Sequence, residues 1–266
     1  MTERVRPGNL SFDFNGRQIL VTGASRGIGL GVAEGFIESG GEVTLLALDD
    51  EVTTVAEQLR DRFGVHVGSL VCDITDRDGV DAALSRLPAI DVLVNNAGLE
   101  LITPMTDVSQ EVAAAFDRIV QINVLGTYNV TRAAIPKMGH GGRIVITASM
   151  WGKTAVPAFS AYCASKHANI GFMRSLAKEL APLGISVNAV CPGWVRTAAS
   201  MRSLSMMAKR TGRDEEALLR EIIDAQAFDG LMEPKDMVPT YLFLASRAAE
   251  NITGQAVTVD RGELLQ

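Results

Sequence analysis

Seven short apolar runs, separated by longer segments with helical spacing, limit the fold of this chain more than any other feature. The runs are rich in Val, Ile and Leu without strict polar alternation, which is typical of strands buried on both faces of a parallel sheet. We predict strands at residues 17–21, 43–47, 65–71, 92–94, 143–147, 185–190 and 256–259. Apolar residues three and four apart predict helices at residues 28–39, 51–63, 76–87, 108–136 and 161–180.

Repeated strand–helix–strand order predicts an α/β fold with a doubly wound parallel sheet of about seven strands and helices on both faces. The 266 residues contain no repeat, linker or low-complexity segment. We therefore expect one domain over residues 14–266, preceded by an N-terminal extension at residues 1–13.

Residues 196–230 interrupt the strand–helix alternation. This segment is long for a plain connection, and it contains Met201, Leu204, Met206, Met207 and Phe228 among interleaved charges. Long connections near a site are often substrate lids, so we expect a lid here. The alternative is an ordinary pair of amphipathic surface helices.

Composition excludes several classes of protein. A net charge of −6 argues against a nucleic-acid-binding protein, which normally carries a basic face. No run approaches the roughly 18 apolar residues of a membrane span, and residues 1–16 lack the apolar stretch of a signal peptide. We therefore expect a cytoplasmic protein with no membrane partner. Cys72, Cys163 and Cys191 lack metal-ligand spacing, so we expect buried free thiols and no metal.

A glycine-rich turn follows the first predicted strand and opens the first helix. Gly23, Gly27 and Gly29 permit a tight turn and let the backbone approach a pyrophosphate closely. The amides at the start of the following helix would point at that anion. Alone, the pattern also fits a strand–helix turn that simply needs glycine, but its position within a strand–helix–strand unit favours a dinucleotide site.

Three polar residues later in the chain form a candidate catalytic group. Tyr162 and Lys166 are four residues apart and share one face of a predicted helix. Ser149 follows a predicted strand at its carboxyl end, where open α/β sheets bind ligands. A tyrosine ordinarily has a pKa near ~10, and a neighbouring ammonium lowers it, so we expect Lys166 to make Tyr162 a usable acid or base.

These residues belong to a larger ordered set of motifs, and with it the chain resembles the classical short-chain dehydrogenases/reductases. The resemblance covers roughly residues 14–262, and Ser149 precedes Tyr162 by the 13 residues usual in the family. The motifs are Thr22-Gly-x-x-x-Gly-x-Gly29, Asn95-Asn-Ala-Gly98, Asn123, Ser149, Tyr162-x-x-x-Lys166 and Pro192-Gly193.

The resemblance implies a single-domain Rossmann fold and an oxidoreductase that interconverts an alcohol and a carbonyl with NAD or NADP. Tyr162 would be the general acid/base, Ser149 would orient the substrate, and Asn123 would hold a water in a proton relay through Lys166. Lys166 would also bind the nicotinamide ribose. The implied cofactor-binding residues are Gly23, Ser25, Arg26, Ile28, Gly29, Asp49, Asp73, Ile74, Asn96, Gly98, Tyr162, Lys166, Pro192, Gly193, Val195 and Thr197.

Structural explanations exist for some of these positions. Asn123 also fits a helix cap or a buried structural amide, and this role and the relay are compatible. Pro192-Gly193 also fits a turn, and Asn95-Asn96 a polar strand end.

The end of the second predicted strand bears on the choice of cofactor. Ala47 and Leu48 occupy the deciding position and are neither acidic nor basic. Asp49 and Asp50 follow, and two carboxylates would repel the 2′-phosphate of NADP. Arg26 is of the type seen in NADP-preferring relatives. The balance favours NAD.

The segments expected beside the nicotinamide indicate the substrate. Met150, Trp151, Phe159 and Trp194, with Val156, Glu100 and Leu101 nearby, predict a mostly apolar, adaptable pocket. We expect a secondary alcohol or ketone on a compact, partly apolar skeleton, cyclic ones included. The alternative is an acidic substrate held by Lys153, Arg202 or Arg210.

Two other functions remain open from the sequence. A 3-ketoacyl-thioester reductase shares the same catalytic set. A catalytically silent cofactor-binding sensor is a different class, but such proteins typically lose the tyrosine or lysine that this chain retains.

The resemblance also implies a homotetramer, which the helices at residues 108–136 and 161–180 could form. The end of the chain, residues 260–266, departs from the family's usual Asp-Gly-Gly, so its role is open.

Overall fold

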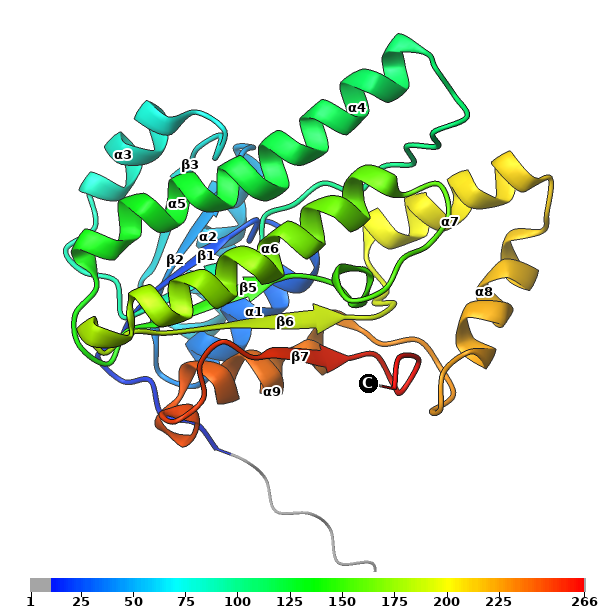
Figure 1. The fold of residues 1–266 in the computed structure, drawn as a ribbon. Coiled ribbons are helices and arrows are strands. Elements are labelled where there is room, and N and C mark those ends of the chain that lie inside the picture. The colour runs from blue at the N-terminus through cyan, green and yellow to red at the C-terminus, as the bar shows by residue number, and fades with distance from the viewer. Residues whose placement is uncertain (1–10, 266) are drawn as a thin grey trace, which may run out of the picture.

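A seven-stranded, fully parallel sheet forms the centre of the protein in the computed structural model, which describes residues 11–265 (Figure 1). The strand order is β3-β2-β1-β4-β5-β6-β7, so the chain crosses over between β3 and β4. All seven predicted strands are present, with ends shifted by at most two residues. They are β1 (Gln18–Thr22), β2 (Glu42–Ala47), β3 (Val67–Val71), β4 (Val92–Asn95), β5 (Arg143–Thr147), β6 (Ser186–Pro192) and β7 (Ala256–Val259).

The apolar strands are explained by burial on both faces of the sheet. Every residue of β5 and β6 is buried. In β1, Ile19 and Val21 belong to the core on one face, whereas Leu20 belongs to the core on the other. Successive side chains of a strand point to opposite faces, so both sets must be apolar when both faces are covered.

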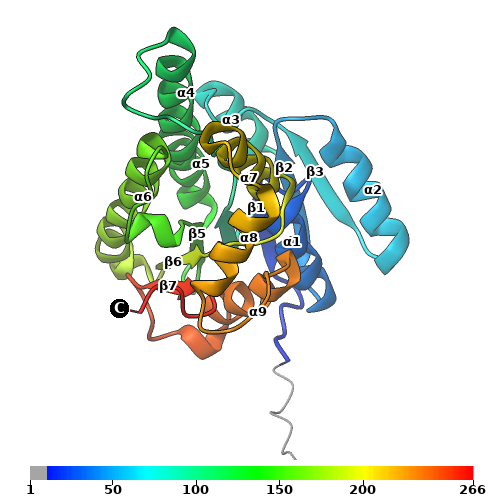
Figure 2. The same ribbon diagram turned by 90° about the vertical axis from the view of Figure 1, so that its right-hand side faces the viewer.

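Helices cover the two faces of the sheet (Figures 1 and 2). The core on one face includes residues of α1 (Gly27–Glu38), α2 (Glu51–Phe63) and α9 (Pro234–Ala245). The opposite core includes residues of α3 (Arg77–Ser85), α5 (Thr127–Ala134) and α6 (Ser160–Glu179). The predicted doubly wound α/β architecture is therefore confirmed. Three single 3₁₀ turns lie at Met150–Gly152, Ala181–Leu183 and Arg247–Ala249.

The helix predicted at residues 108–136 is present as an unbroken helical run, but it is not a regular α-helix throughout. It consists of α4 (Gln110–Val120), a π-helical turn at Gln121–Gly126, α5 and a 3₁₀ turn at Ile135–Lys137. In the π turn, Gly126 packs so tightly that an added Cβ would lie 2.6 Å from Ile74 Cδ1. Such turns often mark functional positions, and this one carries Asn123.

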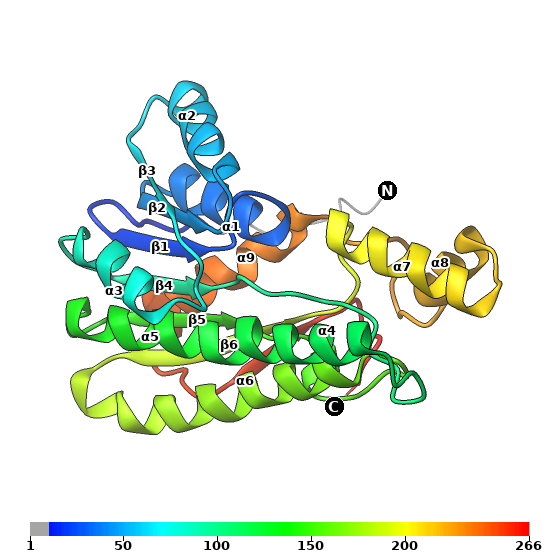
Figure 3. The ribbon, with the colours of Figure 1, turned by 90° about the horizontal axis from the view of Figure 1, so that it is seen from above.

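Residues 196–230 form two helices at the carboxyl end of the sheet, α7 (Ala198–Thr211) and α8 (Glu215–Asp224) (Figures 2 and 3). Thr197 begins α7 with a reciprocal capping box to Ser200, and Gly212 ends it in the left-handed conformation. Leu204 and Leu218 from this pair belong to a third apolar cluster, which also contains Trp151 and Trp194. The segment is thus an amphipathic helix pair packed on the residues that follow β5 and β6.

The predicted N-terminal extension lies mostly outside the described residues, as does Gln266. Phe14 is buried and packs edge-on against Phe36, with 4.9 Å between ring centroids.

Among residues 11–265, none of the helices combines the length and the apolar character needed to cross a membrane. Cys72, Cys163 and Cys191 are buried free thiols, as expected.

Candidate active site

A cavity of about 100 Å³ lies at the carboxyl ends of the central strands. The residues that surround it come from the start of α1, the segments after β4, β5 and β6, α6 and the start of α7. They include many of the predicted site residues: Ile28, Ser149, Met150, Trp151, Tyr162, Pro192, Gly193, Trp194, Val195 and Thr197. Segments distant in sequence therefore converge here because parallel strands end at one edge of the sheet.

Ser149 and Tyr162 line this cavity, and Lys166 lies behind the Tyr162 ring. Ser149 follows β5, and its Oγ accepts a hydrogen bond from the Trp151 amide at 3.1 Å. Tyr162 and Lys166 share one face of α6, with Lys166 Nζ 5.4 Å from the centroid of the Tyr162 ring. Lys166 is buried, and its ammonium donates to the Thr147 carbonyl at 2.8 Å. The predicted group is thus assembled, with the lysine anchored on β5.

The electrostatics of this group differ from the expectation. Burial raises the pKa of the Tyr162 hydroxyl above its usual value; the Glu100 carboxylate raises it further, and Ser149 partly opposes them. The Tyr162 pKa therefore shifts upward, opposite to the lowering expected from a neighbouring ammonium, and burial is the largest cause. Burial also lowers the pKa of Lys166 to about 8, against the opposing effect of Glu100.

Asn123 is fully buried in the π turn and holds the adjacent loop in place. Its Oδ1 accepts from the Leu99 amide at 2.7 Å, and its Nδ2 donates to the Leu99 carbonyl at 2.9 Å and to Ser165 Oγ at 2.9 Å. The side-chain amide therefore joins the loop after β4 to α6. A Cβ added to Gly98 would lie 3.3 Å from Asn123 Oδ1 and 3.5 Å from Lys166 Nζ, so both groups border the same glycine.

The glycine loop packs against the end of β4. A Cβ on Gly29 would lie 2.3 Å from the Gly23 carbonyl oxygen and 2.4 Å from Asn96 Nδ2. Asn96 Nδ2 in turn donates to the carbonyls of Thr22 at 3.1 Å and Gly23 at 3.2 Å. Asn96 therefore shapes the loop, while Ser25 is buried within it.

Arg26, the last residue before α1, forms ion pairs with acidic residues after β2. Its guanidinium contacts Asp49 and lies 2.7 Å from Glu51. The second oxygen of Asp49, Oδ1, is buried and has no hydrogen-bond partner among residues 11–265. Asp49, which favoured NAD, and Arg26, which favoured NADP, are thus paired with each other.

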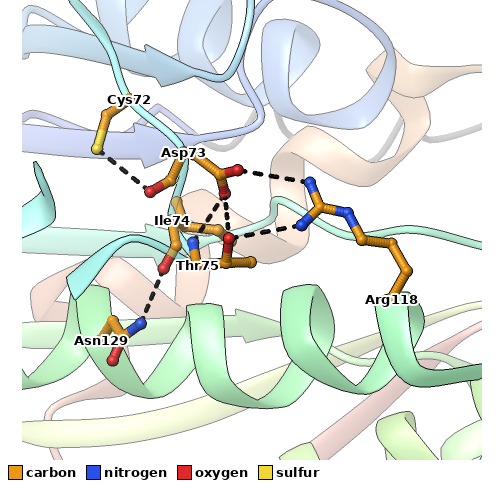
Figure 4. Close-up of polar contacts among 6 residues, drawn as sticks. All are labelled: Cys72, Asp73, Ile74, Thr75, Arg118 and Asn129. Atoms are coloured by element: carbon orange, nitrogen blue, oxygen red, sulfur yellow. Dashed lines mark hydrogen bonds and ion pairs between the residues drawn. The ribbon is translucent and has the colours of Figure 1, made fainter. Parts of the chain in front are cut away.

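Asp73 and Ile74 lie after β3 and are held by α4 and α5 (Figure 4). Asp73 Oδ1 accepts from the amide and hydroxyl of Thr75 at 2.8 and 2.7 Å, and Oδ2 lies 3.4 Å from Arg118. Partial burial by itself would raise the pKa of Asp73, but these hydrogen bonds and the Arg118 charge hold it below its usual value. The Ile74 carbonyl accepts from Asn129 at 3.0 Å.

The predicted substrate residues form the aromatic wall of the cavity, with one exception. Trp151 stacks edge-on against Trp194 at 5.8 Å and against Tyr162 at 6.0 Å between ring centroids. Met150 also faces the cavity. Phe159, however, is fully buried behind Trp151 and does not line it. Phe159 instead lines a second cavity beside α7 and α8, so its predicted substrate role stays a prediction.

The basic residues proposed to hold an acidic substrate do not line this cavity. Lys153 donates to Thr258 at 2.7 Å, and Arg202 and Arg210 are exposed on α7. Two polar residues that line the cavity were missed, Ser200 and Thr147. Thr147 Oγ1 and the buried Tyr241 hydroxyl lie 2.7 Å apart. They are separated by 94 residues, so no local pattern predicts their contact.

The comparisons with known proteins agree with this geometry. A family model described as enoyl-(acyl carrier protein) reductase matches residues 23–263. The oxidoreductase UcpA of Salmonella typhimurium is 37% identical over 257 residues, which cover 94% of this chain and 95% of that protein. This chain belongs to the short-chain dehydrogenase/reductase family. It is accordingly an oxidoreductase.

Solved structures of the same family share the fold. An NAD⁺-bound xylitol dehydrogenase superposes with a TM-score of 0.86 at 29% identity, covering 92% of this chain and 98% of that one. An actinorhodin polyketide ketoreductase with NADPH gives a TM-score of 0.85 at 30% identity, covering 93% and 97%.

In this short-chain dehydrogenase/reductase, the C-terminal segment folds under the cavity. A Cβ on Gly193 would lie 2.7 Å from Asp260 Cβ, so the segment packs directly against the residue after β6. Asp260 accepts from the amides of Gly262 and Leu264 at 3.0 and 2.8 Å. Partial burial and the Asp260 charge raise the pKa of Glu263 from 4.5 to about 7.

We expect Glu263→Gln to stabilise the protein at pH 8 but not at pH 5. A raised pKa means that the folded state binds the proton more tightly than the unfolded chain, so stability is lost as pH rises from 4.5 to about 7. The neutral amide avoids this loss, and after discounting for partial exposure we expect a gain of about 1 kcal/mol at pH 8. Denaturant unfolding at both pH values measures it, with the exposed Glu57→Gln as control. An equal effect at pH 5 and 8 would contradict the prediction.

Proposed function

We propose that this protein is an NAD(P)-dependent dehydrogenase or reductase that interconverts a secondary alcohol and a ketone on a compact, partly apolar substrate, cyclic ones included. The observation that carries the proposal is the meeting of Ser149 and Tyr162 in one cavity, with the Lys166 ammonium 5.4 Å behind the phenol ring. The aromatic wall of Trp151 and Trp194 favours an apolar carbon skeleton.

The residues present fit a dinucleotide. The start of α1 has no side-chain cap and no acidic residue in its first turn, which suits an approaching pyrophosphate. The buried, unpartnered Asp49 Oδ1 suits a ribose hydroxyl at the end of β2. Lys166, with Pro192, Gly193, Val195 and Thr197, would hold the nicotinamide end, and Asp73 with Ile74 would meet the adenine.

The chemistry that this chain's own residues perform is proton transfer and orientation. Bound nicotinamide would supply or accept the hydride. The Ser149 hydroxyl donates to the substrate oxygen and fixes its position. The Tyr162 phenol, kept protonated by burial, donates its proton to that oxygen when a ketone is reduced and accepts it back in oxidation. Lys166 stabilises the phenolate that results, and Asn123 maintains the loop beside them.

The position of α7 and α8 supports a lid role. Thr197 and Ser200 at the start of α7 line the cavity, and Leu204 and Leu218 pack with its aromatic wall. Movement of the helix pair would open that wall. We also propose a homotetramer, as the family resemblance implies, which light scattering tests.

A cofactor-reduction screen over secondary alcohols, sugars and hydroxy acids, with NAD and NADP in parallel, tests the function. We expect turnover of compact secondary alcohols and its absence for phosphorylated compounds. Cofactor binding without turnover of any substrate would instead favour a sensor.

A second cavity favours one alternative, a 3-ketoacyl-thioester reductase. This cavity of about 350 Å³ lies between Phe159 and the α7–α8 pair, with Arg210 and Arg213 at its edge. An acyl chain could occupy its apolar wall and an anionic carrier could contact Arg210, whereas Arg213 is paired with Glu221. Efficient reduction of an acetoacetyl thioester, with no turnover of free alcohols, would support this alternative.

We expect the wild-type protein to prefer NAD, and Asp49→Ala/Glu51→Ala to reverse this preference. Removing both carboxylates removes their repulsion of a 2′-phosphate and releases the Arg26 guanidinium to bind it. The ratio of kcat/KM for NADP over NAD should rise by about tenfold or more, as expected for one charge-assisted contact.

Steady-state kinetics with both cofactors measure this ratio. Glu57→Ala is the matched control, since Glu57 is exposed on the same helix as Glu51 and forms no ion pair among residues 11–265. A wild-type preference for NADP, or an unchanged ratio in the double variant, would contradict the prediction.

A further inference from the structure

A carboxyl group, Glu100, lines the proposed substrate cavity beside Ser149 and Tyr162. It follows Leu99, whose amide and carbonyl are both bound by the buried Asn123 at 2.7 and 2.9 Å. The backbone leading to Glu100 is therefore fixed, and its side chain is partly buried. The proposed proton transfer does not use this residue.

The surroundings of Glu100 come from two helices, α6 and α7. Tyr162 and Lys166 face it from α6, and Ser203 and Arg202 from α7. Burial raises the pKa of Glu100 above its usual value, and hydrogen bonding by the Ser203 hydroxyl and the charges of Lys166 and Arg202 oppose this only in part. Among the described residues, no cationic nitrogen lies within 4.0 Å of the Glu100 carboxylate, so Glu100 forms no ion pair there.

We propose that Glu100 selects substrates with a second hydroxyl on the carbon next to the reacting one, and that its carboxylate accepts a hydrogen bond from this hydroxyl. The inference rests on the proposed function, because Tyr162 defines where the reacting carbon lies. The two hydroxyls of a vicinal diol sit on adjacent carbons, so one can meet Ser149 and Tyr162 while the other meets Glu100.

The charges in the cavity favour a neutral hydroxyl over an amine or a carboxylate. An ammonium group on the substrate would be repelled by the buried Lys166 ammonium, whose charge acts on Glu100 without an ion pair. A carboxylate would be repelled by Glu100 itself, and no arginine lines the cavity to hold it. A hydroxyl satisfies the acceptor without adding charge. The Trp151–Trp194 wall favours an apolar carbon skeleton for the rest of the substrate.

Four substrates of the same length test the proposal: butane-2,3-diol, butan-2-ol, 3-aminobutan-2-ol and 3-hydroxybutyrate. With the preferred cofactor, we expect kcat/KM for the diol to exceed that for butan-2-ol by about tenfold or more, as one hydrogen bond to a charged acceptor provides. In Glu100→Leu the ratio should fall to about one, because the acceptor is gone, and Glu100→Gln should retain part of the preference.

The ratio between substrates isolates the proposed contact. Glu100 also raises the pKa of Tyr162, but that effect acts equally on the diol and the mono-alcohol and cancels in the ratio. Glu111→Gln, an exposed glutamate on α4, is the matched control and should keep the wild-type ratio. Equal use of diol and mono-alcohol by the wild type, or a preference for the amine or the acid, would overturn the proposal.

A binding measurement separates this inference from the proposed function. With saturating cofactor, the diol should raise the Tm of the wild type more than butan-2-ol does, and Glu100→Leu should abolish the difference. If no substrate is turned over, the proposed function fails, whereas a Glu100-dependent shift still supports selection of the diol. Absence of that shift would overturn the inference whatever the activity.

Discussion

Tyr162→Phe is expected to lower kcat by about 10³-fold or more while cofactor affinity changes little, because general acid–base catalysis contributes on this scale. The substitution removes one oxygen atom and keeps the ring that packs at 6.0 Å from Trp151. The fold and the Lys166 contact to Thr147 should therefore persist. Turnover assays and a cofactor fluorescence titration on the same samples measure the two effects separately.

Tyr128→Phe is the matched control for this experiment. Tyr128 lies on α5, is partly exposed and does not line the cavity, so its variant should keep full activity. If Tyr162→Phe retained a tenth or more of the wild-type kcat, proton transfer by Tyr162 would have to be abandoned. Loss of cofactor binding in that variant would show instead that the ring itself had moved.

Gly29→Ala is expected to destabilise the fold and to weaken cofactor binding. The new methyl group would lie 2.3 Å from the Gly23 carbonyl oxygen and 2.4 Å from Asn96 Nδ2, and the first of these is backbone that cannot rotate away. Overpacking of this kind costs about 1–3 kcal/mol, or several degrees in Tm. The glycine loop must shift to relieve the contact, so the site at the start of α1 changes as well.

Gly171→Ala provides the opposite result as a control. Gly171 is exposed inside α6, and an added Cβ meets nothing within 4 Å. Alanine there should stabilise the helix by about 0.5–1 kcal/mol. Denaturant unfolding of both variants distinguishes a local clash from a general effect of the substitution. Wild-type stability in Gly29→Ala would show that the loop tolerates a side chain.

Much of the site follows from local spacing. Tyr162 and Lys166 are four residues apart, so any helix places them on one face, and Ser149 had to lie at the carboxyl end of a strand. The glycine loop was predictable because its conformation requires particular residues. The π turn at 121–126 was not, since an apolar pattern with helical spacing continues through it.

The sequence alone determined the sheet and its burial on both faces. Each strand is visible as a local apolar run, and a strand needs apolar side chains at successive positions only when both faces of the sheet are covered. Only the tertiary structure decided the electrostatics. It paired Arg26 with Asp49, joined Thr147 to Tyr241 across 94 residues and brought Glu100 beside Tyr162. It also reversed the expected shift of the Tyr162 pKa. Burial and long-range charge depend on which segments meet, and no periodicity along a chain encodes that.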